Sequence, residues 1–141
     1  MNIQQRAYLA GLIDGEGCIC ISKNYPVDKR GKVHRVHVQY NLELTITNTN
    51  LSIIRWLSKY AEGRRVTKGR RNARWKTAHN WRATSRGHLI WLLDNVRPYL
   101  QAKKRQAEVA ESFIALGDAS NPYWREKFYL KMRALNHRGP S

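Results

Sequence analysis

The sequence predicts an α+β fold: a four-stranded antiparallel sheet with helices on one face, in the order αββαββα, followed by C-terminal helices. Two observations lead to this prediction. Segments in which apolar and polar residues alternate occur in two pairs, each joined by a turn-like stretch. Segments with an apolar stripe at helical spacing precede, separate and follow these pairs. At 141 residues, the chain is expected to form one domain, residues 1–141, with a loose tail at 136–141.

The first predicted helix covers residues 3–14. It is expected to break at Gly15 and Gly17 and to lead directly into a strand. Ala7, Gly11 and Gly15 recur at every fourth position, so they lie along one side of this helix. Glycine inside a helix costs about 1 kcal/mol relative to alanine, which favours a packing reason for Gly11. Another backbone can approach this side of the helix closely.

Two strands with a charged hairpin tip are predicted next. The first covers residues 18–24 and ends before Pro26 and Gly31. The second alternates most regularly, with an apolar face of Val36, Val38, Tyr40, Leu42, Leu44 and Ile46 and a polar face of Arg35, His37, Gln39, Asn41, Glu43 and Thr45. Arg, His, Gln and Asn are side chains that read base edges, so this polar face favours nucleic-acid recognition over ordinary solvation.

The remaining elements are predicted from caps, periodicity and turns. A polar cap or a proline begins three of the four later helices, and glycine or proline follows the end of three of them. These signals predict helices at residues 51–61, 85–95, 101–116 and 122–135, and a second hairpin with strands at 65–70 and 74–84 and a turn near 71–73.

The chain is strongly basic. It contains 26 Lys and Arg against 10 Asp and Glu, which gives a net charge of +16 and a pI near 10.5. Residues 63–93 hold nine of the positive charges and no acid. The tryptophans in this run require a core to bury in, so the run predicts a structured basic sheet instead of a disordered segment. Nucleic acid is the expected partner, and an anionic membrane surface is the weaker alternative.

Cysteine usage and hydropathy indicate the compartment. Cys18 and Cys20 lie two residues apart on a predicted strand, which does not indicate a disulfide framework, and no second Cys/His pair has zinc-ligand spacing. The longest strongly apolar run, residues 89–93, is far too short to span a bilayer, and no signal peptide is recognised. We therefore expect an intracellular protein of a reducing compartment: a bacterial or phage-infected cytoplasm, or an organelle.

Residues 9–17, LAGLIDGEG, resemble the motif of the LAGLIDADG homing endonucleases, with glycine and glutamate at the seventh and eighth motif positions. The order of predicted elements is also similar to the family's core over nearly the whole chain. The resemblance implies an intron-encoded, site-specific endonuclease that cuts both strands of a long pseudo-palindromic DNA target. Because the chain carries one motif, the resemblance implies a homodimer that meets through the side of the helix formed by Ala7, Gly11 and Gly15.

The resemblance also implies site residues. Glu16 corresponds to the catalytic carboxylate that binds metal, helped by the backbone carbonyl of Gly15. Mg²⁺ is the expected ion, and other hard divalent cations such as Mn²⁺ or Ca²⁺ suit the same oxygen ligands. Lys103 matches the family's active-site lysine, and Asn48 falls where the family often has a glutamine that positions water. Asp14 is expected to tie down the helix end.

Candidate DNA contacts follow from the outward parity of the predicted sheet and from the basic run. Base edges are the expected partners of Ser22, Asn24, Arg35, His37, Gln39, Asn41, Asn80 and Arg82. Phosphates, which position the protein without specifying sequence, are the expected partners of Arg64, Lys68, Arg70 and Arg71.

Other interpretations stay open on the sequence alone. An RNA-binding splicing cofactor (maturase) acting on host intron RNA, or a non-catalytic DNA-binding protein of the same fold, needs the basic surface but not Glu16. Within the site, Glu16 would then form only a salt bridge or a cap. The neighbouring Lys104 and Arg105 leave the register of the active-site lysine open.

Overall fold

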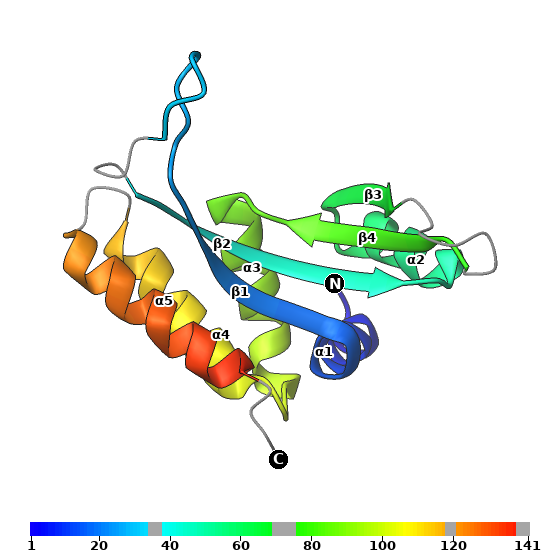
Figure 1. Ribbon diagram of the computed structural model, residues 1–141. Helices are drawn as coiled ribbons and strands as arrows, with labels where there is room; N and C mark the ends of the chain where they lie inside the picture. The colour runs from blue at the N-terminus through cyan, green and yellow to red at the C-terminus, as the bar shows by residue number, and fades with distance from the viewer. Residues whose placement is uncertain (34–37, 69–75, 118–120, 138–141) are drawn as a thin grey trace.

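The computed structural model describes residues 1–33, 38–68, 76–117 and 121–137, and it confirms the predicted α+β fold (Figure 1). A four-stranded antiparallel sheet is flanked by helices. In chain order the elements are α1 (Ile3–Glu16), β1 (Gly17–Asn24), β2 (Gln39–Asn48), α2 (Leu51–Tyr60), β3 (Arg64–Lys68), β4 (Ala78–Ala83), α3 (Arg86–Val96), the short 3₁₀ helix η1 (Arg97–Tyr99), α4 (Lys104–Leu116) and α5 (Pro122–Asn136).

The sheet has the strand order β1-β2-β4-β3, with every neighbouring pair antiparallel. β1 pairs with β2 along its whole length, from Gly17 opposite Ile46 to Asn24 opposite Gln39. β4 pairs with β2 only from Leu44 onward. The first part of β2, residues 39–43, therefore has β1 on one side and no β4 pairing on the other.

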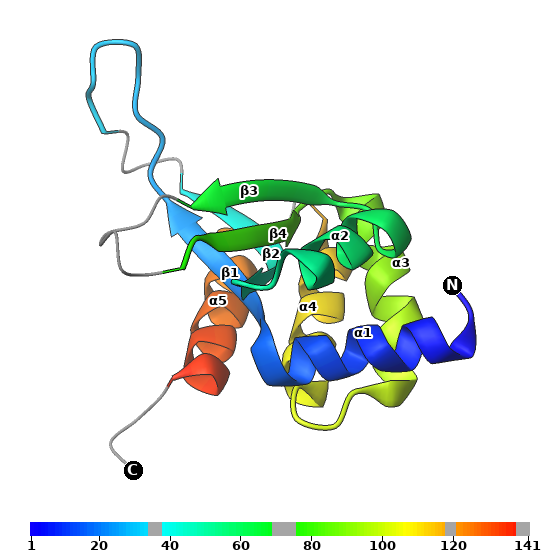
Figure 2. The ribbon, with the colours of Figure 1, turned by 90° about the vertical axis from the view of Figure 1, so that its right-hand side faces the viewer.

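One face of the sheet is buried and the other is open. On β1 and β2 the buried residues alternate with exposed or half-buried ones, and the helices cover the apolar face (Figures 1 and 2). The fully buried side chains of this core include Leu9, Ile19, Leu44, Ile46, Leu57 and Trp81. The layered arrangement leaves the polar face of the strands available to a ligand.

Two predicted helix boundaries are wrong, and both errors lie near α1. The helix does not break at Gly15 but continues to Glu16, and Gly17 begins β1 at once. Glycine is needed at the junction because a Cβ on Gly17 would lie 2.7 Å from Cα of Ile13. α4 begins at Lys104 instead of residue 101, because the preceding amides bond to a carboxylate at the end of α1.

The other boundaries agree with the prediction within a few residues, where the structure describes them. β2 begins at Gln39, and the predicted start of this strand at residues 35–37 lies outside the described residues. The same holds for the predicted turn near 71–73 and for most of the tail. Within the described ranges, no helix is long and apolar enough to cross a membrane.

Candidate active site and nucleic-acid interface

The C-terminal end of α1 is fixed by Asp14. Its carboxylate accepts hydrogen bonds from the backbone N–H groups of Gln101, Ala102 and Lys103, at 2.8, 3.1 and 3.0 Å. The carboxylate thus acts as a cap for the segment that leads into α4, although it comes from a distant part of the chain. The structure therefore joins the end of the motif helix to the start of α4, which brings Lys103 to the motif.

Lys103 lies directly beside the end of α1. Its ammonium Nζ donates to the backbone oxygen of Asp14 at 2.9 Å, and the residue is half-buried, whereas Lys104 and Arg105 are exposed. The last carbonyls of a helix lack intrahelical partners and carry partial negative charge, so a cation is stabilised there. Of these three described basic residues, Lys103 is the one that bonds to the motif helix.

Glu16 and Asn48 meet at the same end of α1. The side-chain amide of Asn48 donates to Oε2 of Glu16 at 2.5 Å, and Oδ1 of Asn48 accepts from the backbone N–H of Asn50 at 2.7 Å. The second bond fixes which side of the Asn48 amide faces Glu16. Glu16 is exposed, so its carboxylate is held in position and still open to solvent.

The donor atoms at this end of the helix suit a hard divalent cation. They are the carboxylate of Glu16 and the backbone oxygen of Gly15 in the last helical turn. Among the described residues, no group of three or more His, Cys, Asp and Glu side chains could hold a metal. Mg²⁺ is commonly held by one or two carboxylates together with substrate phosphates and water. The single carboxylate is therefore compatible with a magnesium site that the substrate completes.

The register places the described candidate DNA contacts on the open face of the sheet. Ser22 lies opposite Asn41, Asn24 opposite Gln39, and Arg82 opposite both Thr45 and Arg64. Lys68 is the last residue of β3 and pairs with Ala78 on β4. Four further predicted contacts lie outside the described residues: Arg35, His37, Arg70 and Arg71.

Two residues of this face differ from the expectation. Asn80 is only 7% exposed, and its side-chain oxygen accepts a hydrogen bond from the hydroxyl of Thr47, so little of it is accessible to DNA. Glu43, which the sequence analysis did not include among the contacts, forms a salt bridge with Arg82 at 2.9 Å. Glu43 has the same parity as Gln39 and Asn41, and this parity was the signal that could have identified it.

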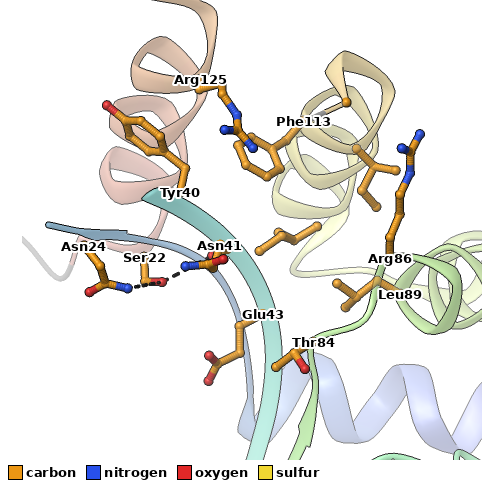
Figure 3. A pocket seen from close by; sticks show the side chains of 13 residues that line it. Ser22, Asn24, Tyr40, Asn41, Glu43, Thr84, Arg86, Leu89, Phe113 and Arg125 are labelled. Carbon is orange, nitrogen blue, oxygen red and sulfur yellow. Dashed lines mark hydrogen bonds between the residues drawn. The ribbon is translucent and has the colours of Figure 1, made fainter. Parts of the chain in front are cut away.

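A cavity of about 460 Å³ adjoins the open face of the sheet (Figure 3). It lies next to the first part of β2, which does not pair with β4. On the sheet side, the hydroxyl of Ser22 donates to the backbone oxygen of Asn41 and accepts from the amide of Asn24, both at 3.4 Å. On the helix side, the guanidinium of Arg125 lies over the rings of Phe113 and Tyr40. The open face thus extends into a groove with hydrogen-bonding groups along one wall.

Both cysteines are free thiols. The pKa of Cys18 is lowered to about 6, mainly by the hydrogen bond from the Cys20 thiol and partly by the positive charge of Lys103, against the opposing effect of burial. The same hydrogen bond, together with burial, raises the pKa of Cys20. The effect on Cys18 indicates that the charge of Lys103 acts on the first residues of β1, next to Glu16.

The two sides of α1 have different surroundings. Leu9, Ala10 and Ile13 are fully buried against the sheet and helices. Gly11 and Gly15 are exposed, and a Cβ added to either would meet no atom within 4 Å. Ala7 is exposed on the same side. Among the described residues, nothing requires a glycine at position 11 or 15.

Comparison with known proteins gives consistent matches. The family model described as LAGLIDADG endonuclease matches residues 9–107. The structure is similar to that of the homing endonuclease I-CvuI in complex with a DNA target in the presence of magnesium, with a TM-score of 0.77 and 21% identity over 99% of this chain and 88% of that chain. It is equally similar to an archaeal intron-encoded homing endonuclease complexed with DNA, with a TM-score of 0.77 and 17% identity over 97% of this chain and 87% of that one.

A longer protein also matches. The structure of the I-SmaMI LAGLIDADG homing endonuclease bound to cleaved DNA gives a TM-score of 0.68 and 17% identity, over 100% of this chain and only 45% of that chain. The comparison with curated proteins gives no match. At these identities, the structural similarities establish the fold, and the family model establishes the family.

Proposed function

The chain belongs to the LAGLIDADG endonuclease family, and from this membership we propose that it is a site-specific DNA endonuclease that cuts both strands as a homodimer with Mg²⁺. The observation that carries the proposal is the arrangement at the end of α1. There the motif carboxylate Glu16 is exposed and hydrogen-bonded to Asn48, and the ammonium of Lys103 bonds to the backbone oxygen of Asp14, two residues before Glu16. The target is a long pseudo-palindromic DNA site.

The roles of the site residues follow from their contacts. Mg²⁺, when bound, stabilises the charge that develops on the attacked phosphate and lowers the pKa of a bound water. Glu16 supplies the anionic ligand, and Asn48 holds one of its carboxylate oxygens in place. The Lys103 ammonium adds positive charge beside the phosphate, where preorganised charge stabilises a transition state most effectively.

The open face of the sheet supplies DNA binding. Arg64 and Lys68 contribute positive charge from the edge strand, which suits phosphates, while Ser22, Gln39 and Asn41 present hydrogen-bonding groups that suit base edges. DNA is consistent with the net charge of +16. The free thiols of Cys18 and Cys20 fit action in an intracellular, reducing compartment.

A second copy of the chain completes the enzyme. One chain has one motif carboxylate, and cutting two strands requires two. The exposed side of α1 with Gly11 and Gly15 allows the backbones of two such helices to approach closely, which would bring two Glu16 residues near a common axis. The longer similar protein leaves just over half of its chain unmatched, which is room for a second unit of this size within one polypeptide.

The test is metal-dependent cleavage. Incubation of the wild-type protein with a random-site plasmid library and Mg²⁺, followed by sequencing of the cut ends, identifies the target. On a supercoiled plasmid carrying that target, we expect the wild type to produce linear DNA. Glu16→Gln should cut at least about a hundredfold more slowly and still bind the target.

Glu108→Gln is the matched control, because Glu108 is exposed on α4 and makes the same change of charge away from the site. It should cut as the wild type does. If Glu16→Gln cuts as fast as Glu108→Gln, Glu16 is not the catalytic carboxylate. If the wild type cuts no DNA at any Mg²⁺ concentration, the endonuclease assignment is wrong.

A further inference from the structure

An acidic residue lies on the open face of the sheet. By strand parity, this face includes Ser22 on β1, Gln39 and Asn41 on β2, and Arg64 and Arg82 on the other two strands. Among the described strand residues of the face, Glu43 is the single acid. A carboxylate there repels the phosphates of bound DNA and opposes the electrostatic attraction of the basic chain. Its presence therefore requires an explanation.

A contribution to the stability of the fold does little to explain why Glu43 lies on this face. Oε1 of Glu43 contacts Nη2 of Arg82 at 2.9 Å, with side chains that are 19% and 44% exposed. Ion pairs between exposed side chains contribute little to folding, and the arginine half of this pair is open to solvent. The pair is also not needed to align the strands, because Arg82 lies directly opposite Thr45 and reaches Glu43 diagonally.

The geometry of the Glu43–Arg82 ion pair suits recognition of one kind of DNA base pair. An arginine presents five N–H donors in a planar fork. Arg82 contacts Glu43 through Nη2, so other N–H groups of its guanidinium can donate to DNA. In the major groove, arginine binds O6 and N7 of guanine, and a glutamate accepts from the N4 amino group of cytosine. Glu43 engages Arg82 through Oε1 and so leaves Oε2 for a second partner. The two side chains together match both halves of a G·C pair.

We propose that Arg82 and Glu43 read one G·C base pair in each half of the DNA target, an inference that rests on the proposed function. Arg82 contacts the guanine. Glu43 orients the guanidinium and accepts from the paired cytosine.

The pair lies close to the catalytic end of the sheet. Arg82 shares a cross-strand row with Thr45, which in turn lies opposite Cys18 on β1. Cys18 follows Glu16 by two residues, so their Cα atoms are at most about 7.6 Å apart. With base pairs spaced about 3.4 Å apart, the G·C pair is in the inner part of the half-site, a few base pairs from the cut.

The experiment cuts the random-site plasmid library with the wild type and with each variant, and it compares their base preferences at each target position. We expect the wild type to prefer G·C at one inner position of each half-site. Arg82→Ala should lower that preference about tenfold and leave the other positions unchanged. Glu43→Ala should lower the preference at the same position, and Glu43→Gln, which keeps an acceptor oxygen, should retain part of it.

Arg64→Ala is the control, because Arg64 is the cross-strand neighbour of Arg82 on the edge strand. It should weaken cutting of all sequences without changing base preference, and melting temperatures should confirm that every variant is folded. If Arg82→Ala and Glu43→Ala slow cutting uniformly and keep all base preferences, the pair is structural and the proposal is wrong. A wild type that cuts no member of the library overturns the proposed function and this proposal together.

Discussion

The two helices at the ends of the chain, α1 and α5, have nearly equal lengths and opposite constructions. α1 buries Leu9, Ala10 and Ile13 completely, whereas α5 buries only Met132 among its described residues. The outer side of α1 carries Ala7, Gly11 and Gly15 after an exposed Ile3 in its first turn, and that of α5 carries large side chains, with Tyr123 64% exposed. A small-residue surface lets another helix backbone approach closely, and a surface of large side chains keeps it away.

The anchors of the two helices differ as well. α5 is attached to the sheet by polar side chains: Glu126 contacts Lys23 and Tyr40, and the amide of Asn136 donates to the backbone oxygen of Ile19 at 2.7 Å. α1 is held by its buried apolar side and, at its end, by Asp14. The comparison indicates that α1 is fixed rigidly where it presents Glu16, while α5 supports the edge of the sheet.

Placing a larger side chain on the outer side of α1 should have the largest effect. Gly11→Gln should raise the dimer dissociation constant at least a hundredfold, because the added side chain separates the two helix backbones. The fold should be unaffected or slightly stabilised, since a Cβ at this position meets no atom within 4 Å and glutamine is a better helix former. Sedimentation with and without target DNA measures the dimer, and plasmid linearisation measures double-strand cutting.

Gly87→Gln is the matched control, because Gly87 is also an exposed helical glycine with no atom within 4 Å of its added Cβ. It should leave both the dimer and cutting unchanged. A Gly11→Gln protein that remains dimeric and linearises the plasmid would show that the outer side of α1 is not the interface.

The same two helices show how far sequence reasoning extends. α5 was predicted within one residue because its start signal, Asn121 followed by Pro122, is local. The predicted end of α1 is two residues early because a glycine at position 15 favours a break, whereas the structure continues the helix through it. The start of α4 was misplaced because its preceding amides bond to Asp14, 87 residues earlier, and such a contact has no local signal.

The residues of the candidate site also fall into two groups: those that a local sequence pattern identifies and those that depend on contacts across the sheet. The contiguous motif identifies Glu16, and strand parity identifies the open face, because both are local patterns. The contact between Glu43 and Arg82 depends on the register that sets Thr45 opposite Arg82, and no pattern within either strand specifies that register. The near burial of Asn80 likewise depends on its neighbour Thr47 across the sheet.

Removing the anchor of α1 should have a smaller effect, on stability. Asp14→Ala removes the acceptor for three backbone N–H groups, so the free energy of unfolding should fall by about 2 kcal/mol. Cutting should fall as well, because the backbone N–H of Lys103 loses its carboxylate partner at the motif, although the bond from its ammonium to the backbone oxygen of residue 14 remains possible. Denaturant unfolding measures the first effect and plasmid linearisation the second.

Asp94→Ala is the control for this change, since Asp94 is an exposed acid on α3. Its free energy of unfolding should stay within about 0.5 kcal/mol of the wild type. Equal stability of the Asp14→Ala and Asp94→Ala proteins would contradict the role of Asp14 as the anchor of α1.

Removing the anchor of α5 should have the smallest effect, and its pH dependence has a definite sign. Hydrogen bonds from the Tyr40 hydroxyl and the Lys23 ammonium lower the pKa of Glu126, while burial and the bond to Glu126 raise the pKa of Tyr40 to about 12. A lowered carboxyl pKa stabilises the fold above the ordinary value of about 4.3, and this stability is lost as the pH falls through the lowered pKa. Glu126→Gln should therefore lower the melting temperature by about 2 °C at pH 7. The difference from the wild type should shrink below about pH 4, and a difference that instead grows toward acid would contradict the assignment of Glu126 as the anchor.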